Sequence, residues 1–222
     1  SIIEKFLPNN ISTIGMSGTL WNGNIQNLVI DKVGLQNTKW SANPLNLLLG
    51  KVKADVTIDS NNLKGDFATT YAGTDLLAED VLLNGELSLL APYFERYGLR
   101  INGQFDANFD VLHVKNGLPH NANGTLQTFN TSILGIIPLN LGDVSSQFSE
   151  QADGILISLN NQNGELDING VINVSESGVY NADITLSRNA ITPDNVLQTV
   201  QMIGKKVGED SVKVLHRGRL GI

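Results

Sequence analysis

Most of the chain alternates apolar and polar residues, and this pattern constrains its fold more than any other feature. In residues 51–59, "KVKADVTID", every second residue is apolar and the others are charged or polar. A two-residue period is that of a β-strand, and one apolar face per strand is typical of an antiparallel sheet with one solvated side. Further strands are predicted at 11–20, 24–33, 62–72, 80–89, 99–113, 122–129, 152–159, 164–174 and 179–187.

A short pattern recurs within these segments: an apolar residue, any residue, glycine, any residue and a second apolar residue. It is centred on Gly18, Gly65, Gly85, Gly103 and Gly170, with a weaker copy at Gly124. Each glycine falls on the apolar face, which indicates a sharp bend or a close approach of two backbones. We therefore predict an all-β fold: one strongly curved, mostly antiparallel sheet, an open half-barrel or groove with an apolar concave face. The alternative is that a chain with 22 glycines produces such copies by chance.

Helical segments are few. Residues 193–207 begin with proline after Thr192, a candidate cap, and carry an apolar stripe of Val196, Val200, Ile203 and Val207. These features predict an amphipathic helix over 193–207 that packs on the core. Short helical turns are predicted at 2–7, 44–49 and 88–97. Since no low-complexity linker interrupts the chain, residues 1–222 are expected to form a single domain.

Charge and composition exclude several classes of protein. The net charge of −7 argues against a nucleic-acid partner, because phosphate binding needs clustered lysine and arginine. The chain has no cysteine, so disulfides and thiol chemistry are excluded. Five of the fifteen basic residues lie in the last 18 positions: Lys205, Lys206, Lys213, Arg217 and Arg219. This tail is either a solvated end or a contact for an acidic partner or a lipid surface.

No motif for catalysis is present. His113 and His120 are seven residues apart, but no thiol or carboxylate pattern completes a metal site around them. The sequence also lacks a nucleophile elbow, a phosphate-binding loop and a dinucleotide fingerprint. We therefore predict no catalytic, metal-binding or cofactor-binding residues, and a protein that is not an enzyme.

The two tryptophans lie in the most specific stretch of the sequence, residues 14–56. "GTLWNG" contains Gly18, Thr19, Leu20, Trp21 and Gly23, and after about twenty residues come Trp40 and then "PLNLLLG" with Pro44, Leu45, Leu48, Leu49 and Gly50. These positions resemble the protein N family of bacterial type II secretion systems. Physically, we expect both tryptophans to anchor the start of the sheet and to hold the Pro44–Leu49 turn against the concave face. A partner contact is the alternative role for the rings.

The resemblance implies a periplasmic β-rich domain carried by a single inner-membrane helix. Residues 1–10 would then be the membrane-proximal segment, with the anchor missing before Ser1. It implies a non-enzymatic component that acts through contacts with other inner-membrane or periplasmic secretion subunits. The glycine repeats give a weaker likeness to the AsmA-like and TamB-like envelope proteins. That likeness implies the alternative function, an apolar groove that binds lipid or another amphiphile.

Overall fold

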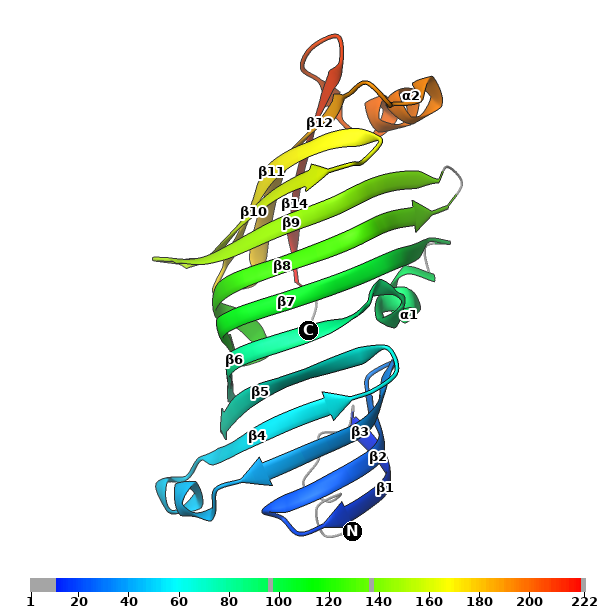
Figure 1. The fold of residues 1–222 in the computed structure, drawn as a ribbon. Coiled ribbons are helices and arrows are strands. Elements are labelled where there is room, and N and C mark those ends of the chain that lie inside the picture. The colour runs from blue at the N-terminus through cyan, green and yellow to red at the C-terminus, as the bar shows by residue number, and fades with distance from the viewer. Residues whose placement is uncertain (1–10, 96–97, 136–137, 221–222) are drawn as a thin grey trace.

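The computed structural model describes residues 11–95, 98–135 and 138–220. Within these residues a single sheet runs through fourteen strands, and all neighbouring strands are antiparallel (Figure 1). Each strand up to β12 pairs with the next in sequence, after which β14 pairs with β12 and β13 lies outermost. The strands are β1 Ile11–Gly18, β2 Asn22–Ile30, β3 Val33–Ala42, β4 Val52–Asp59, β5 Leu63–Ala72, β6 Asp75–Glu86, β7 Arg100–Lys115, β8 Leu118–Leu134, β9 Leu139–Gln151, β10 Gly154–Gln162, β11 Leu166–Ser175, β12 Val179–Arg188, β13 Lys205–Lys206 and β14 Ser211–Arg219.

Four short helical elements interrupt the described strands. They are the 3-10 turns η2 Pro44–Leu49 and η3 Leu87–Leu90 and the α-helices α1 Ala91–Phe94 and α2 Asp194–Ile203. Of these elements, η2 agrees with the turn predicted at 44–49, and η3 together with α1 agrees with the turn predicted at 88–97. The turn predicted at 2–7 and the membrane-proximal segment proposed at 1–10 lie outside the described residues. None of the described helices has the length and apolar character needed to cross a membrane.

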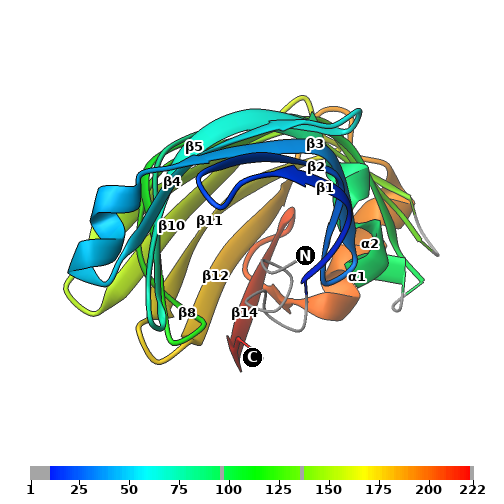
Figure 2. The ribbon, with the colours of Figure 1, turned by 90° about the horizontal axis from the view of Figure 1, so that it is seen from below.

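The sheet is curved and open, as the alternation and the repeated glycines predict. Figure 2 shows its strands following an arc whose two ends do not meet. The register places Ile25, Thr38, Ile58, Gly65, Leu83 and Ala107 in one row across β2 to β7. Because the sheet is a single layer, curvature must bring these side chains together for them to be buried, so we assign this apolar row to the concave face. The turn η3 adds Leu89 to the cluster that contains Ile58, and Leu87 of the same turn is also buried.

β-Bulges contribute to this shape by locally increasing the twist of the strands. Opposite Phe67, β6 carries an extra residue, and Asp80 there has a φ of 52°. In β8 the register with β9 shifts between Thr128 and Thr131, and Asn130 has a φ of 49°. The backbone N–H of Asn130 donates a hydrogen bond to the Asp143 carboxylate at 2.9 Å. Asp143 on β9 therefore holds the backbone of this bulge.

The Asp143 contact makes a pH-dependent contribution to stability. The hydrogen bond from the Asn130 backbone, and then that from the Asn163 side chain, lower the pKa of Asp143 below its ordinary value of 3.8. A carboxyl group whose pKa is depressed in the folded state stabilises the fold above its unfolded pKa, and this contribution is lost as the pH falls through the folded pKa. We expect Asp143→Asn to lower the urea midpoint at pH 7, with a smaller deficit relative to the parent chain below pH 3.8. An equal deficit at both pH values would contradict this assignment.

The C-terminal helix is shorter than predicted. The apolar stripe predicts a helix over 193–207, but α2 ends at Ile203, Gly204 is extended, and Lys205 and Lys206 pair with β14. Thr192 does not cap α2 through its side chain. Its hydroxyl instead accepts the Asn189 backbone N–H at 2.8 Å and donates to the Glu165 carbonyl oxygen. The prediction failed at this end because strand pairing with β14 takes the residues that the helix would need.

The part of the stripe within α2 packs as predicted. Val196 and Val200 are each 3% exposed and form a cluster with Leu166 of β11 and Val212 of β14, which are 1% and 0% exposed. Partly buried Leu139 and Leu186 pack against this cluster. Helix α2 therefore covers the apolar face at the C-terminal end of the sheet.

Candidate functional site

The "GTLWNG" segment forms the turn between β1 and β2. The Thr19 hydroxyl accepts the backbone N–H groups of Trp21 and Asn22, both at 3.2 Å, and the Thr19 N–H donates to the Asn22 carbonyl oxygen at 2.8 Å. Gly18 has a φ of 107°, a conformation that other residues rarely adopt. The glycine and threonine of the motif therefore shape a tight turn that a side chain at position 18 would disrupt.

Trp40 connects this turn to the third strand. Its indole ring covers Gly23 on the neighbouring strand, so that a Cβ atom at position 23 would overlap the ring. The indole N–H donates to the Leu20 carbonyl oxygen at 3.2 Å, and the Ala42 N–H donates to the Trp21 carbonyl oxygen at 2.6 Å. Both tryptophans are half-buried. The structure thus brings together the first part of the motif, and Gly23 leaves the space that the Trp40 ring fills.

Removing the Trp40 ring should weaken the start of the sheet. Truncating a large buried aromatic residue costs roughly 3–5 kcal/mol, and because Trp40 is only half-buried we expect Trp40→Ala to cost about 2 kcal/mol. Tyr71→Ala is the control, since Tyr71 is a 51% exposed aromatic residue at a strand end and should cost less than about 1 kcal/mol. Urea midpoints measure both. If the two variants were equally stable, the ring would lie loosely on the surface, available for a partner.

The Pro44–Leu49 turn is not held against the concave face, contrary to the prediction from the sequence. Figures 1 and 2 place η2 beyond the ends of β3 and β4, outside the arc, rather than on the concave face. Leu45 is 69% exposed, and Leu20 of the motif is 53% exposed. The Asn43 side chain accepts the Leu45 N–H at 3.0 Å, while the Lys51 N–H donates to the Asn46 carbonyl oxygen at 3.1 Å. Gly50, after the turn, has a φ of 69° with open space around it. Of Leu48 only the backbone is described.

Four of the repeated glycines lie directly opposite large apolar residues of neighbouring strands. Gly65 pairs with Leu83 and Gly85 pairs with Leu63, so in this hairpin each glycine lies opposite a leucine of the other strand. Gly170 likewise lies between Leu159 and Ile184. Added Cβ atoms would meet backbone at each of these positions and at Gly103 and Gly124, and Gly65, Gly103 and Gly124 have φ values of 155°, 134° and 153°. We propose that these five glycines permit the curvature of the sheet.

Gly124 shows most clearly how the concave face is filled. Phe109 of β7 and Phe148 of β9 flank it in the register, and their rings meet edge-to-face with centroids 5.0 Å apart. The two rings come from strands that are not neighbours, and they meet above the glycine because it has no side chain. Val81 and Ala107 are 3% and 8% exposed in the same cluster. The middle of the groove is therefore occupied by the protein's own side chains.

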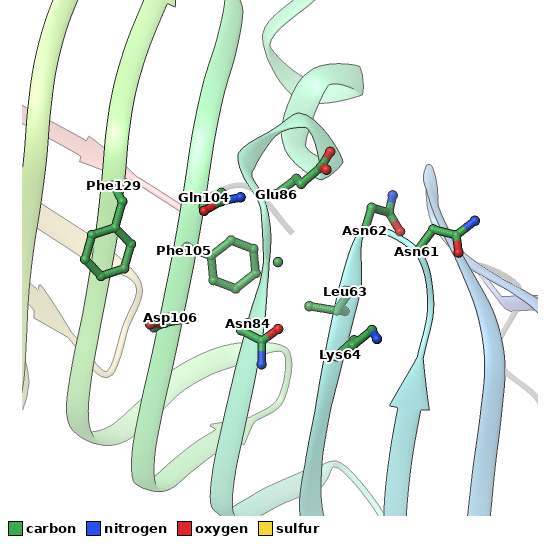
Figure 3. Close-up of a pocket in the computed structure, with 11 residues that line it drawn as sticks. Asn61, Asn62, Leu63, Lys64, Asn84, Glu86, Gln104, Phe105, Asp106 and Phe129 are labelled. Atoms are coloured by element: carbon green, nitrogen blue, oxygen red, sulfur yellow. The ribbon is translucent and has the colours of Figure 1, made fainter.

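A hollow beside this core surrounds Gly85 and measures about 390 Å3. Figure 3 shows the rings of Phe105 and Phe129 among amide and charged side chains from β5, β6 and β7. The lining residues are Asn61, Asn62, Leu63, Lys64, Asn84, Gly85, Glu86, Gln104, Phe105, Asp106 and Phe129. This lining contains no serine, cysteine or histidine that could form a nucleophile–base pair. The amide and charged side chains of this lining can form hydrogen bonds with a polar surface.

The histidines lie near turns and at the sheet edge. The rings of His113 and His120 contact edge-to-face at 4.9 Å, and His120 Nδ1 lies 3.1 Å from the Glu176 carboxylate. His216 stacks on Tyr180. Across the described parts of the chain, no group of three or more histidine, aspartate or glutamate side chains is arranged to hold a metal ion.

The open sheet leaves two edge strands. On the described residues, β1 has a partner on one side only, and β14 has a full partner on one side but only the two-residue β13 on the other. Unpaired strand edges present backbone donors and acceptors to another chain. Sequence reasoning recognised the basic tail but not that it is a strand. The signal was present, because basic residues at 213, 217 and 219 share one face of an alternating segment.

A comparison with protein families agrees with the motif. The family model for type II secretion system (T2SS), protein N matches residues 9–214, which is most of the chain. No curated protein matches the sequence, and no solved structure matches the fold.

Proposed function

The chain belongs to the type II secretion system protein N family and so has a role in type II protein secretion, and we propose that it works as a non-enzymatic periplasmic component. In this proposal it binds other subunits of the secretion machine and carries out no chemistry itself. It works as a single domain over residues 1–222, which is supported by the one hydrogen-bonded sheet that runs through the described residues. The domain is held at the inner membrane by an N-terminal anchor, as the family resemblance implies.

The observation that carries this proposal is the combination of open edges with a filled groove. A 14-stranded sheet that ends in the unpaired edges described above can extend by accepting a strand from another protein. The centre of the concave face, in contrast, is packed with buried side chains of the chain itself, including Ile58, Val81 and Phe109. This arrangement favours protein contacts at the edges over a ligand in the groove.

One specific observation keeps lipid or amphiphile binding as the second candidate. At one rim of the concave face, Val52, Tyr71 and Leu76 form a row across β4, β5 and β6. They are 45%, 51% and 44% exposed. An exposed apolar row of this kind marks an interaction surface. An acyl chain could lie along it without entering the packed centre of the groove.

Affinity purification from cross-linked envelopes tests the first candidate. The full-length protein, tagged and expressed in cells with an intact secretion system, should co-purify with other inner-membrane or periplasmic subunits of that system. A strain that lacks the remaining secretion genes is the matched control. Recovery of the same proteins from both strains, with no secretion subunit among them, would contradict the proposal.

Mass spectrometry of an organic extract tests the second candidate. Protein purified without cross-linking should carry phospholipid well below one molecule per chain if the groove is filled by its own side chains. Near-stoichiometric phospholipid that is lost in a Tyr71→Asp/Leu76→Asp variant would instead establish the lipid-binding function. Leu82→Asp is the control, because Leu82 is 55% exposed on the opposite face of β6.

A further inference from the structure

The outer edge of β14 is the feature with the most specific recognition chemistry. This strand pairs with β12 along its whole length, from Ser211 to Arg219. On its other side, β13 pairs only with Val212 and Lys213. From residue 214 onward, no described strand covers that side. Half of the backbone donors and acceptors in 214–219 therefore face outward, where an added strand could bind them.

Basic side chains line one face of this edge. Residues alternate between faces along a strand, and Val212, which is 0% exposed, marks the face toward the core. Lys213, Leu215, Arg217 and Arg219 consequently share the opposite face. Lys213 is paired with Asp183 at 2.9 Å. Arg217 and Arg219 are exposed, and neither forms an ion pair with another residue in the described ranges.

A hollow with both apolar and polar lining residues lies beside Arg217. It measures about 410 Å3 and is lined by Val171, Ala182 and Leu215 together with Asn173, Asn181, Asp183, His216 and Arg217. Leu215 and Val171 are apolar residues on the solvated face of the sheet, and they are 64% and 37% exposed. This face thus offers an apolar contact next to two cations spaced two residues apart.

We propose that residues 213–219, the basic edge, bind an extended acidic segment of another secretion subunit, which adds to the sheet as a further strand. Such a segment would carry acidic residues at alternate positions opposite Arg217 and Arg219, and an apolar residue near Leu215. The arginines form charge-assisted hydrogen bonds with carboxylates, and the backbone supplies affinity that does not depend on sequence. This inference rests on the proposed function and names the surface and the kind of partner.

A second copy of this chain does not fit the basic edge. Pairing β14 with another β14 would bring arginine and lysine side chains of both copies together, and like charges on paired strands are destabilising. The other open edge, β1, has the sequence "ISTIGMSG" and offers no acidic residue. The charge of the edge therefore selects a different, acidic partner.

Site-specific photo-cross-linking in living cells tests this inference on the full-length protein. A photoreactive amino acid at position 215 should cross-link to a secretion subunit, at a peptide with acidic residues at alternate positions. The same amino acid at position 82 is the matched control, because Leu82 is 55% exposed on the solvated face of β6, away from both edges. Position 82 should give no such product.

Reversing the charge of Arg217 and Arg219 provides a second test in the same cross-linking experiment. Arg217→Glu/Arg219→Glu should reduce the cross-link from position 215 at least about tenfold, because like charges then face each other at the interface. Lys32→Glu/Lys39→Glu changes the net charge equally at exposed positions far from β14 in the sheet, and should leave the cross-link unchanged. Circular dichroism and a urea melt of each variant confirm that the sheet is intact.

Several outcomes would overturn the inference. Cross-links from position 215 only to phospholipid, or only to a second copy of the chain, would replace the acidic strand with those occupants. Cross-links to secretion subunits from position 82 but not from position 215 would reject the basic edge while the proposed function stands. If neither position cross-linked to a secretion subunit, and purification from cross-linked envelopes also recovered none, the proposed function would fail as well.

Discussion

Gly65→Val and Gly124→Val are each expected to lower the free energy of unfolding by about 3 kcal/mol. A Cβ atom at Gly65 would overlap the Leu82 carbonyl oxygen and lie 2.9 Å from the Leu83 Cα, and one at Gly124 would lie 2.8 Å from the Phe109 ring. Overpacking costs roughly 1–3 kcal/mol. The φ values of 155° and 153° add a further cost, on the order of 1–2 kcal/mol, for a β-branched residue. Urea melts measure the combined loss in the free energy of unfolding.

Gly34→Val is the matched control for these substitutions. Gly34 also lies in a strand, but a Cβ atom there meets nothing within 4 Å, and its φ lies outside the left-handed region. Valine has a higher strand propensity than glycine, so this variant should be as stable as the parent or slightly more stable. If Gly65→Val and Gly124→Val also matched the parent, the role of the glycines in curvature would be wrong.

Leu166→Ala is expected to cost about 3–4 kcal/mol. Leu166 is 1% exposed and packs on Val196 and Val200 of α2 and on Val212 of β14. Replacing a fully buried leucine with alanine removes its transfer free energy and leaves a cavity, at a cost of roughly 2–5 kcal/mol. Chemical denaturation followed by circular dichroism gives the change.

Leu82→Ala controls for the loss of a leucine as such, because this side chain is 55% exposed and its removal should cost less than about 1 kcal/mol. An equal loss in both variants would mean that α2 is not docked on the sheet. Since α2 and β14 share the Leu166 cluster, such a result would also mean that β14, the strand that carries the basic edge, is not firmly packed.

Much of the fold could be predicted from alternation alone. The segment 99–113 corresponds to β7, Arg100–Lys115, and the glycine pattern correctly indicated a curved sheet because the glycines lie where backbones approach closely. Strand β3 was missed because Asn37, with a φ of 48°, interrupts its alternation, so that Leu35 and Thr38 are both buried. Strand β9 was missed because it is rich in polar residues, among them Ser145 and Ser146.

The functional regions were less accessible to sequence reasoning. The motif around Trp21 indicated the family, which the match over residues 9–214 confirms, but not that Trp40 covers Gly23. That contact depends on the pairing of β2 with β3, which no local pattern encodes. The basic edge was hidden for a similar reason. The alternating positions of its basic residues already indicate that they share one face, but the tail looks like a solvated end until its pairing with β12 shows that it is a strand.

Native mass spectrometry of the full-length protein, released from the envelope under mild conditions, tests the central claim most directly. The claim is that this open sheet binds other secretion subunits at its edges while its own side chains fill the groove. It predicts complexes whose mass corresponds to this chain plus another secretion subunit, with no phospholipid bound at one molecule per chain. A chain that carried one or more phospholipids and never a second subunit would contradict the claim.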